Sequence, residues 1–219
     1  MAESKAGSRV WADRAIPGEG FLRDAVRVGA ANLLMVLCAW IAIPLPWTPV
    51  PVTGQTFGVM LVGALLGSRR GAIMLGLYLL EGLAGLPVFQ PFGLPGAARL
   101  AGPTAGYLLS YPVAAFVIGW LVERQSHSEI VQQAGAQAVR QTGNTSSLAL
   151  APVLRLVAAL LAGELVVFTG GCAWLATGFG LGWPKAVAVG AMPFVAGELI
   201  KMVLVVVAVY GVESANHRD

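Results

Sequence analysis

The sequence predicts an all-α integral membrane protein whose six transmembrane helices form one bundle. Of its 219 residues, 57% are hydrophobic and 11% are charged, whereas soluble domains average about 45–50% and about 25% respectively. The apolar residues gather in long runs, and the charged residues lie mainly at the edges of these runs. A soluble helix buries one face and carries charge on the other. The apolar runs are therefore expected to face lipid.

Six apolar runs are candidate spans because their interiors carry few or no charges. The second of them is short and poorly bounded. Between the fifth and the sixth, a ten-residue apolar piece opens at Trp183-Pro184 and ends before Pro193. It is too short to cross a bilayer, so an interfacial or re-entrant helix is expected there. The six predicted spans cover residues 25–43, 56–66, 71–86, 105–122, 153–175 and 193–211.

The distribution of Lys and Arg predicts that both chain ends lie in the cytoplasm. Eleven of the 14 lie in or next to the tails and the loops at 69–70 and 123–152, whereas two, Arg99 and Lys185, lie in the alternate loops. Cytoplasmic loops carry such an excess of positive charge. We therefore expect a cytoplasmic tail at 1–24, a six-helix membrane domain at 25–212 and a cytoplasmic tail at 213–219. The segment 123–152 is expected to be a cytoplasmic linker, with at most a short surface helix around 128–140.

The positions of the acidic and histidine side chains argue against an enzyme. Asp13, Asp24 and Asp219 are terminal, and His127 and His217 lie in predicted cytoplasmic segments. No intramembrane aspartyl, His-Glu metal or Ser-His site can be assembled from them. The sequence also has no phosphate-binding loop of the G-x-x-x-x-G-K-[ST] type, so energy must come from a gradient or a partner. The basic residues form no single patch, so no nucleic-acid partner is expected.

Four acidic or basic side chains lie more than three residues inside the predicted spans: Glu81, Glu164, Glu198 and Lys201. A charge at the bilayer centre costs at least about 2.5–3.5 kcal/mol, so each is a candidate functional residue. Glu198 and Lys201 are three residues apart and share a helix face, as ligand contacts or as a structural ion pair. Glu164 could face the same cavity or be satisfied by a neighbouring group. Glu81 lies near the end of its span and could reach the interface.

Polar residues and proline-rich loops at the outer ends of the spans are candidates for a binding site. Gln55, Thr104 and Tyr107 lie at such ends, where they could recognise a ligand, pack or cap. The uncharged, proline-dense segment 44–53 is expected to be a lid, since its backbone is too polar to lie in lipid. A rigid connector between two helices is the alternative. The apolar residues that would cover a ligand are Leu45, Trp47 and Val50.

Five motifs, in this order and spacing, resemble the BioY family, the biotin-binding S components of energy-coupling factor (ECF) transporters. They are IPLP at 43–46 with PVPVTGQTF at 49–57, LGSRRG at 66–71, GLPVF at 85–89, GPTAGYL at 102–108 and GELIK at 197–201. Any one of these motifs would be weak evidence. Together they are strong evidence, and the resemblance extends over about residues 40 to 211.

The resemblance implies a multi-pass protein of a prokaryotic cytoplasmic membrane that captures biotin from outside. It implies three partners, a transmembrane coupling subunit and two ATPases that bind ATP in its place, and no cofactor on this chain. It also implies that Glu198 and Lys201 contact the ligand. Further expected contacts, whose order along biotin stays open, are Gln55, Phe89, Arg99, Thr104, Tyr107 and Glu164.

Four alternatives remain at this stage. The chain could be an S component for another small vitamin, a biotin transporter that acts alone, an intramembrane enzyme or a structural membrane scaffold.

Overall fold

A computed structural model describes residues 21–136 and 150–216, and within them the fold is mainly helical. Seven α-helices occur in this part of the chain, together with two short 3₁₀ helices and a two-stranded antiparallel hairpin. The elements in chain order are α2 (Phe21–Trp40), β1 (Ala42–Ile43), β2 (Val52–Thr53), α3 (Gln55–Leu66), α4 (Ser68–Leu83), η1 (Gly96–Ala101), α5 (Ala105–Ala136), α6 (Leu150–Thr177), α7 (Trp183–Gly190), η2 (Met192–Phe194) and α8 (Val195–Asn216).

The helices agree with a membrane protein. Three helical stretches, 105–125, 151–177 and 183–210, are long and apolar enough to cross a membrane, and α3 is a shorter apolar helix. Each of the six predicted spans corresponds to one of the longer helices, and the short apolar piece before the last span forms α7. Large apolar side chains also point outward, and Leu165 on α6 is 69% exposed. The number of membrane crossings stays a prediction.

Two helix ends differ from the predicted boundaries. The fourth span is part of a much longer helix, since α5 continues to Ala136 through much of the predicted linker. Residues 123–134 contain neither glycine nor proline, so nothing in the backbone stops the helix there. The rest of the linker, 137–149, lies outside the described residues. The first helix ends at Trp40, and Ile43 is extended because it precedes Pro44.

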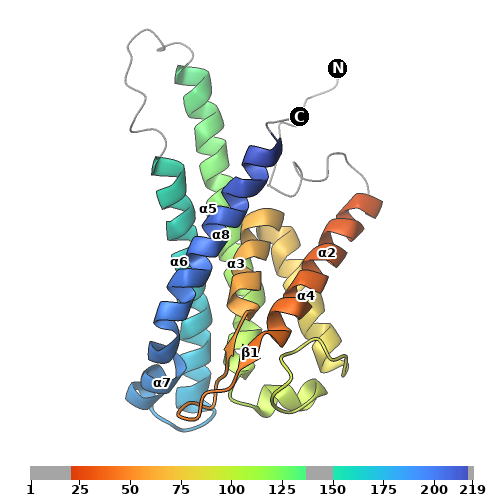
Figure 1. The fold of residues 1–219 in the computed structure, drawn as a ribbon, viewed down its shortest axis with the longest axis vertical. Coiled ribbons are helices and arrows are strands. Elements are labelled where there is room, and N and C mark those ends of the chain that lie inside the picture. The colour runs from red at the N-terminus through yellow and green to blue at the C-terminus, as the bar shows by residue number, and fades with distance from the viewer. Residues whose placement is uncertain (1–20, 137–149, 217–219) are drawn as a thin grey trace.

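The helices run roughly side by side, and their connections gather at the two ends of the bundle (Figure 1). The start of α2 and the end of α8 lie at one end. The β1–β2 hairpin, the loop of residues 84–104 with η1, and α7 lie at the other, which we call the hairpin end. The longest helix, α5, packs against α3, α4 and α6.

Glycines permit this close packing around α5. A Cβ on Gly106 would collide with the backbone of Gly170 on α6, and one on Gly119 would collide with Ser68 at the start of α4. Small residues at such crossings let helix backbones approach each other in a membrane. The packing fixes the first turn of α5 beside α6, where both helices contribute to a cavity at the hairpin end.

Candidate functional site

An inner cavity lies at the hairpin end, between the hairpin and the helices beneath it. Its volume is about 40 Å³. The hairpin covers it, and the first turns of α3 and α5, the middle of α6, η2 and α8 form its other walls. The lining residues are Val50, Pro51, Thr53, Gln55, Thr56, Thr104, Tyr107, Tyr111, Val167, Phe168, Phe194 and Glu198.

An outer cavity of about 370 Å³ adjoins the inner one. Pro51 and Thr104 line both cavities, so the two cavities are neighbours, and we treat them as the inner and outer chambers of one composite candidate site. The outer chamber lies between the hairpin and the loop of residues 84–104. The side chains that line it include Leu45 and Thr48 of the hairpin, Gln90, Phe92, Leu94 and Arg99 of the loop, and Phe179 after α6.

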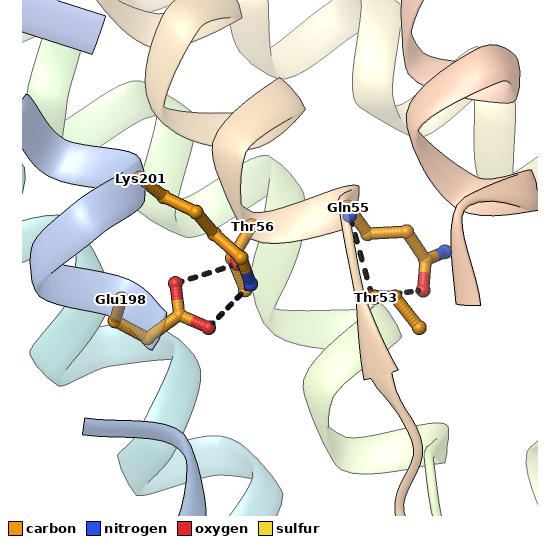
Figure 2. A network of polar contacts seen from close by, with 5 residues as sticks. All are labelled: Thr53, Gln55, Thr56, Glu198 and Lys201. Atoms are coloured by element: carbon orange, nitrogen blue, oxygen red, sulfur yellow. Dashed lines mark hydrogen bonds and ion pairs between the residues drawn. The ribbon is translucent and has the colours of Figure 1, made fainter. Parts of the chain in front are cut away.

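Three side chains form a closed polar network beside the inner cavity (Figure 2). The Nζ of Lys201 donates to Glu198 Oε1 at 2.7 Å and to Thr56 Oγ1 at 2.9 Å, and Thr56 Oγ1 donates to Glu198 Oε2 at 2.7 Å. Glu198 lies in the first turn of α8, where the partial positive charge of the helix N-terminus stabilises a carboxylate. Glu198 and Thr56 line the inner cavity.

Lys201 is not part of that wall. It lines a separate apolar groove between α2, α3 and α8, on the other side of its pair with Glu198. The structure therefore places Lys201 as the counter-ion of a carboxylate that faces the inner cavity.

Gln55, the first residue of α3, has both ends of its amide engaged. Its Oε1 accepts a hydrogen bond from Thr53 Oγ1 at 3.2 Å, and its Nε2 donates to the hydroxyl of Tyr78 at 2.9 Å. Figure 2 shows the amide beside Thr53. Gln55 follows Gly54, whose N–H donates to the carbonyl of Ile41, and this bond joins the base of the hairpin to the start of α3.

Arg99 is buried in the wall of the outer cavity. Its Nη1 donates to the carbonyl of Phe92, its Nη2 donates to the carbonyl of Gln90 at 2.9 Å, and its guanidinium lies 5.7 Å from the centre of the Phe89 ring. Arg99 Nε is buried without a hydrogen-bond partner among the described residues. One cation therefore organises the loop of residues 84–104 and faces the outer chamber.

The structure brings most of the predicted site residues to the two cavities. Val50, Gln55, Tyr107 and Glu198 line the inner cavity, Leu45 and Arg99 line the outer one, and Thr104 lines both. The Tyr107 hydroxyl also donates to the carbonyl of Gly190 at 2.7 Å, which ties α5 to α7.

Besides Lys201, three predicted site residues lie outside the two cavity walls. The ring of Phe89 packs edge-on against Tyr78 with 5.4 Å between the ring centres, behind the cavity wall. Trp47 is 65% exposed at the tip of the hairpin. Glu164 is 6% exposed within the bundle, one turn before the cavity residues Val167 and Phe168 on α6, and its Oε2 has no hydrogen-bond partner among the described residues.

Outside the predicted lid segment, five residues that line the inner cavity were not predicted from the sequence: Thr56, Tyr111, Val167, Phe168 and Phe194. Thr56 directly follows Gln55 within the first motif, so its position beside a predicted site residue could have indicated it. Tyr111 is one turn after Tyr107 on α5, at the spacing that places two side chains on one helix face. Phe168 and Phe194 lie in apolar runs in which nothing distinguishes them from packing residues.

Comparison with known proteins identifies the family. The chain matches the BioY family over residues 7–218. The chain belongs to the BioY family. It is 38% identical over 174 residues to the biotin transporter BioY of Rhizobium etli, across 80% of this chain and 83% of that protein. It is 34% identical over 193 residues to the biotin transporter BioY of Rhodobacter capsulatus, across 83% and 88%.

A solved structure shares the fold of this BioY-family chain. It is the crystal structure of the S-component for biotin from an ECF-type ABC transporter, with a TM-score of 0.68 and 24% sequence identity. The likeness covers 88% of this chain and 92% of that chain.

Four of the five BioY motifs meet at the hairpin end. The first forms the hairpin and the start of α3, the third and fourth lie in or after the loop of residues 84–104, and the fifth contains Glu198 and Lys201. The second motif, residues 66–71, lies at the α3–α4 turn instead. There the N–H and the hydroxyl of Ser68 donate to the carboxylate of Glu123 at 2.8 and 2.7 Å.

Proposed function

We propose that this chain is the high-affinity biotin-binding and uptake subunit, the S component, of an ECF-type transporter in a prokaryotic cytoplasmic membrane. The composite cavity carries the proposal, because it joins an apolar chamber with a few polar groups to a wider chamber with a buried cation. Membership of the BioY family and the names of its relatives support the ligand. Binding and transport, not catalysis, are its role.

The polar groups of the two chambers match the two ends of biotin. The ureido group of biotin carries two N–H donors and one carbonyl acceptor, and Glu198, Thr56 and Gln55 offer partners for both kinds in the inner cavity. The valerate carboxylate of biotin needs a cation or donors. Arg99, which lines the outer cavity, offers a cation there.

Charge selects this orientation over the reverse. A ligand carboxylate in the inner cavity would lie beside the carboxylate of Glu198, and like charges in a medium of low dielectric repel strongly. We therefore place the ureido rings in the inner cavity and the carboxylate beside Arg99.

Binding of this kind requires the inner cavity to widen. A volume of about 40 Å³ is far below the roughly 300–1,000 Å³ of ordinary ligand pockets. Val50 and Pro51 of the hairpin form part of its wall, and Pro51 also lines the outer cavity. Outward movement of the hairpin is the change that would admit biotin without displacing a helix of the bundle.

Six membrane crossings with both termini in the cytoplasm complete the proposal. The hairpin end then faces outward, so that biotin is captured from outside. A transmembrane coupling subunit and two ATPases would supply the energy, since this sequence has no phosphate-binding loop. The variant of the proposal in which the chain acts alone predicts uptake in cells that lack those partners.

Competition binding tests the ligand. Purified, detergent-solubilised protein should bind labelled biotin, and unlabelled biotin should displace the label whereas equimolar thiamine, riboflavin and niacin should not. Mass spectrometry of the purified protein should detect co-purified biotin when the cells are grown with it. Displacement by one of the other vitamins, or the absence of biotin binding, would reject the proposed function.

A further inference from the structure

We propose that Tyr78 is a positioning residue for ligand recognition: its hydroxyl fixes the orientation of the Gln55 amide in the inner cavity and connects that amide to the loop of residues 84–104. Tyr78 itself lines neither cavity, so it acts on the ligand only through Gln55. The inference rests on the proposed function, because it assigns the recognition of the ureido group in that site.

The Tyr78 hydroxyl makes two hydrogen bonds. It accepts a bond from Gln55 Nε2 at 2.9 Å and donates to the carbonyl of Val88 at 3.0 Å. A carbonyl accepts only, so the hydroxyl proton is committed to Val88 and the oxygen is left to accept. The Tyr78 oxygen therefore requires a donor from Gln55, and only the NH₂ end of the amide can supply one.

The other end of the Gln55 amide contacts Thr53. Gln55 Oε1 accepts from Thr53 Oγ1 at 3.2 Å, and the Gln55 backbone N–H donates back to that hydroxyl at 3.3 Å. The hydroxyl of a threonine could either donate to or accept from a neighbouring amide, so Thr53 alone would permit both orientations of the amide. Tyr78 removes this freedom.

Tyr78 is buried in contact with the loop of residues 84–104. Its side chain is fully buried on α4, and the ring of Phe89 packs against it edge-on. The guanidinium of Arg99 lies over the same Phe89 ring. The Tyr78 hydroxyl and ring thus contact both the inner-cavity amide and the loop that carries Arg99, which links the two chambers of the site.

The consequence for recognition is a fixed hydrogen-bond donor. With one N–H of Nε2 committed to Tyr78, the second N–H is available to donate into the inner cavity, where it suits the ureido carbonyl of biotin. A ligand that carries a hydrogen-bond donor in place of that carbonyl would bring its donor against the N–H of Gln55. Sites with buried polar groups reject such analogues because a polar group is left unpaired.

The test compares Tyr78→Phe, Gln55→Ala and the double variant in biotin binding by the purified full-length chain. Tyr78→Phe keeps the ring and its packing and removes the hydroxyl. We expect the affinity for biotin to fall by about 3- to 10-fold, the effect of one lost hydrogen bond. In the Gln55→Ala background the same change should have little further effect, because the amide that it positions is gone.

The second readout is discrimination between ligands. In 2-iminobiotin an imine nitrogen that donates replaces the ureido oxygen that accepts. Tyr78→Phe frees the amide to turn its Oε1 toward the cavity. The affinity for biotin should therefore fall by a larger factor than the affinity for 2-iminobiotin, which lowers the ratio of the two affinities. A purely structural role of Tyr78 would weaken both ligands equally and lower the thermal stability equally in both backgrounds.

Tyr210→Phe is the matched control, since it removes one hydroxyl from α8 outside the site and should leave biotin affinity unchanged. Wild-type affinity and discrimination in Tyr78→Phe, or an undiminished effect in the Gln55→Ala background, would overturn the inference alone. If Tyr78→Phe does not fold, Gln55→Ala still tests the donor on which the inference depends, since an unchanged preference for biotin over 2-iminobiotin in that variant would overturn it. A wild-type protein that binds no biotin would overturn the proposed function and the inference with it.

Discussion

Glu198, Lys201 and Thr56 satisfy one another in a ring of three hydrogen bonds, and only two of the three face the inner cavity. The spacing of Glu198 and Lys201 predicted their pairing, because residues three apart share a helix face. It did not predict Thr56, since that contact depends on where α3 crosses α8. Nor did spacing show that Lys201 lies behind the carboxylate and not in the cavity wall.

At the scale of these residues we predict that Lys201→Met weakens biotin binding by at least about 1.5–3 kcal/mol, the range for a hydrogen bond to a charged group. Without Lys201, Glu198 is a buried carboxylate with Thr56 as its only partner in the network, and an unpaired buried charge is costly. Isothermal titration of the purified variant measures the loss. Lys185→Met, which removes an exposed cation of α7, is the control and should bind normally.

A double variant separates the counter-ion role of Lys201 from direct contact with the ligand. Adding Glu198→Gln to Lys201→Met removes the unpaired charge, so the double variant should recover thermal stability relative to Lys201→Met alone. Unchanged biotin affinity in a well-folded Lys201→Met protein would contradict any part for Lys201 in the site.

At the scale of elements, apolar runs predicted every longer helix but not the hairpin. Each of its strands has only two residues, Ala42 pairing with Thr53 and Ile43 with Val52, too few for an alternating pattern to be recognised. The proline-rich sequence did predict a loop at the mouth of a site. The contact of this loop with α7 could not be predicted from the sequence, because it depends on Thr48 Oγ1, which donates to the carbonyl of the distant residue Val189.

The hairpin is expected to act as the lid over bound biotin. Replacing Trp47 and Val50 together by Ser should speed biotin release several-fold with little effect on capture, because losing apolar cover lowers the barrier to escape and affinity changes within one site appear mainly in the dissociation rate. Stopped-flow displacement of labelled biotin measures the rate. The effect should come from Val50, which lines the inner cavity, and not from the exposed Trp47.

Trp47→Ser alone is therefore the matched control for the lid and should release biotin at the wild-type rate. If the double variant also releases biotin at that rate, the hairpin is a rigid connector between α2 and α3 and not the lid.

At the scale of the whole molecule, charge in the loops predicted an orientation that agrees with the placement of the site. Four of the five family motifs meet at the hairpin end, and the loops that contain Arg99 and Lys185 lie at that end too (Figure 1). Among the described residues, Arg27, Arg69, Arg70, Arg124 and Arg155 lie on segments toward the opposite end. An outward-facing hairpin end would therefore present the cavities to the outside while obeying the positive-inside tendency.

The length of α5 makes this orientation testable. A helix of 32 residues is about 48 Å long at 1.5 Å per residue, whereas the hydrocarbon core of a bilayer is about 30 Å thick. If Ala105 lies at the outer surface, the last turns of α5 must emerge into the cytoplasm. A cysteine placed at Gln133 should then react with a membrane-impermeant maleimide in inverted vesicles or opened cells but not in intact cells. Lys185→Cys on α7 is the control, and it should label from outside. Cys38 and Cys172 are buried and should contribute little background. Labelling of Gln133→Cys in intact cells would reverse the orientation and with it the direction from which the cavities receive their ligand.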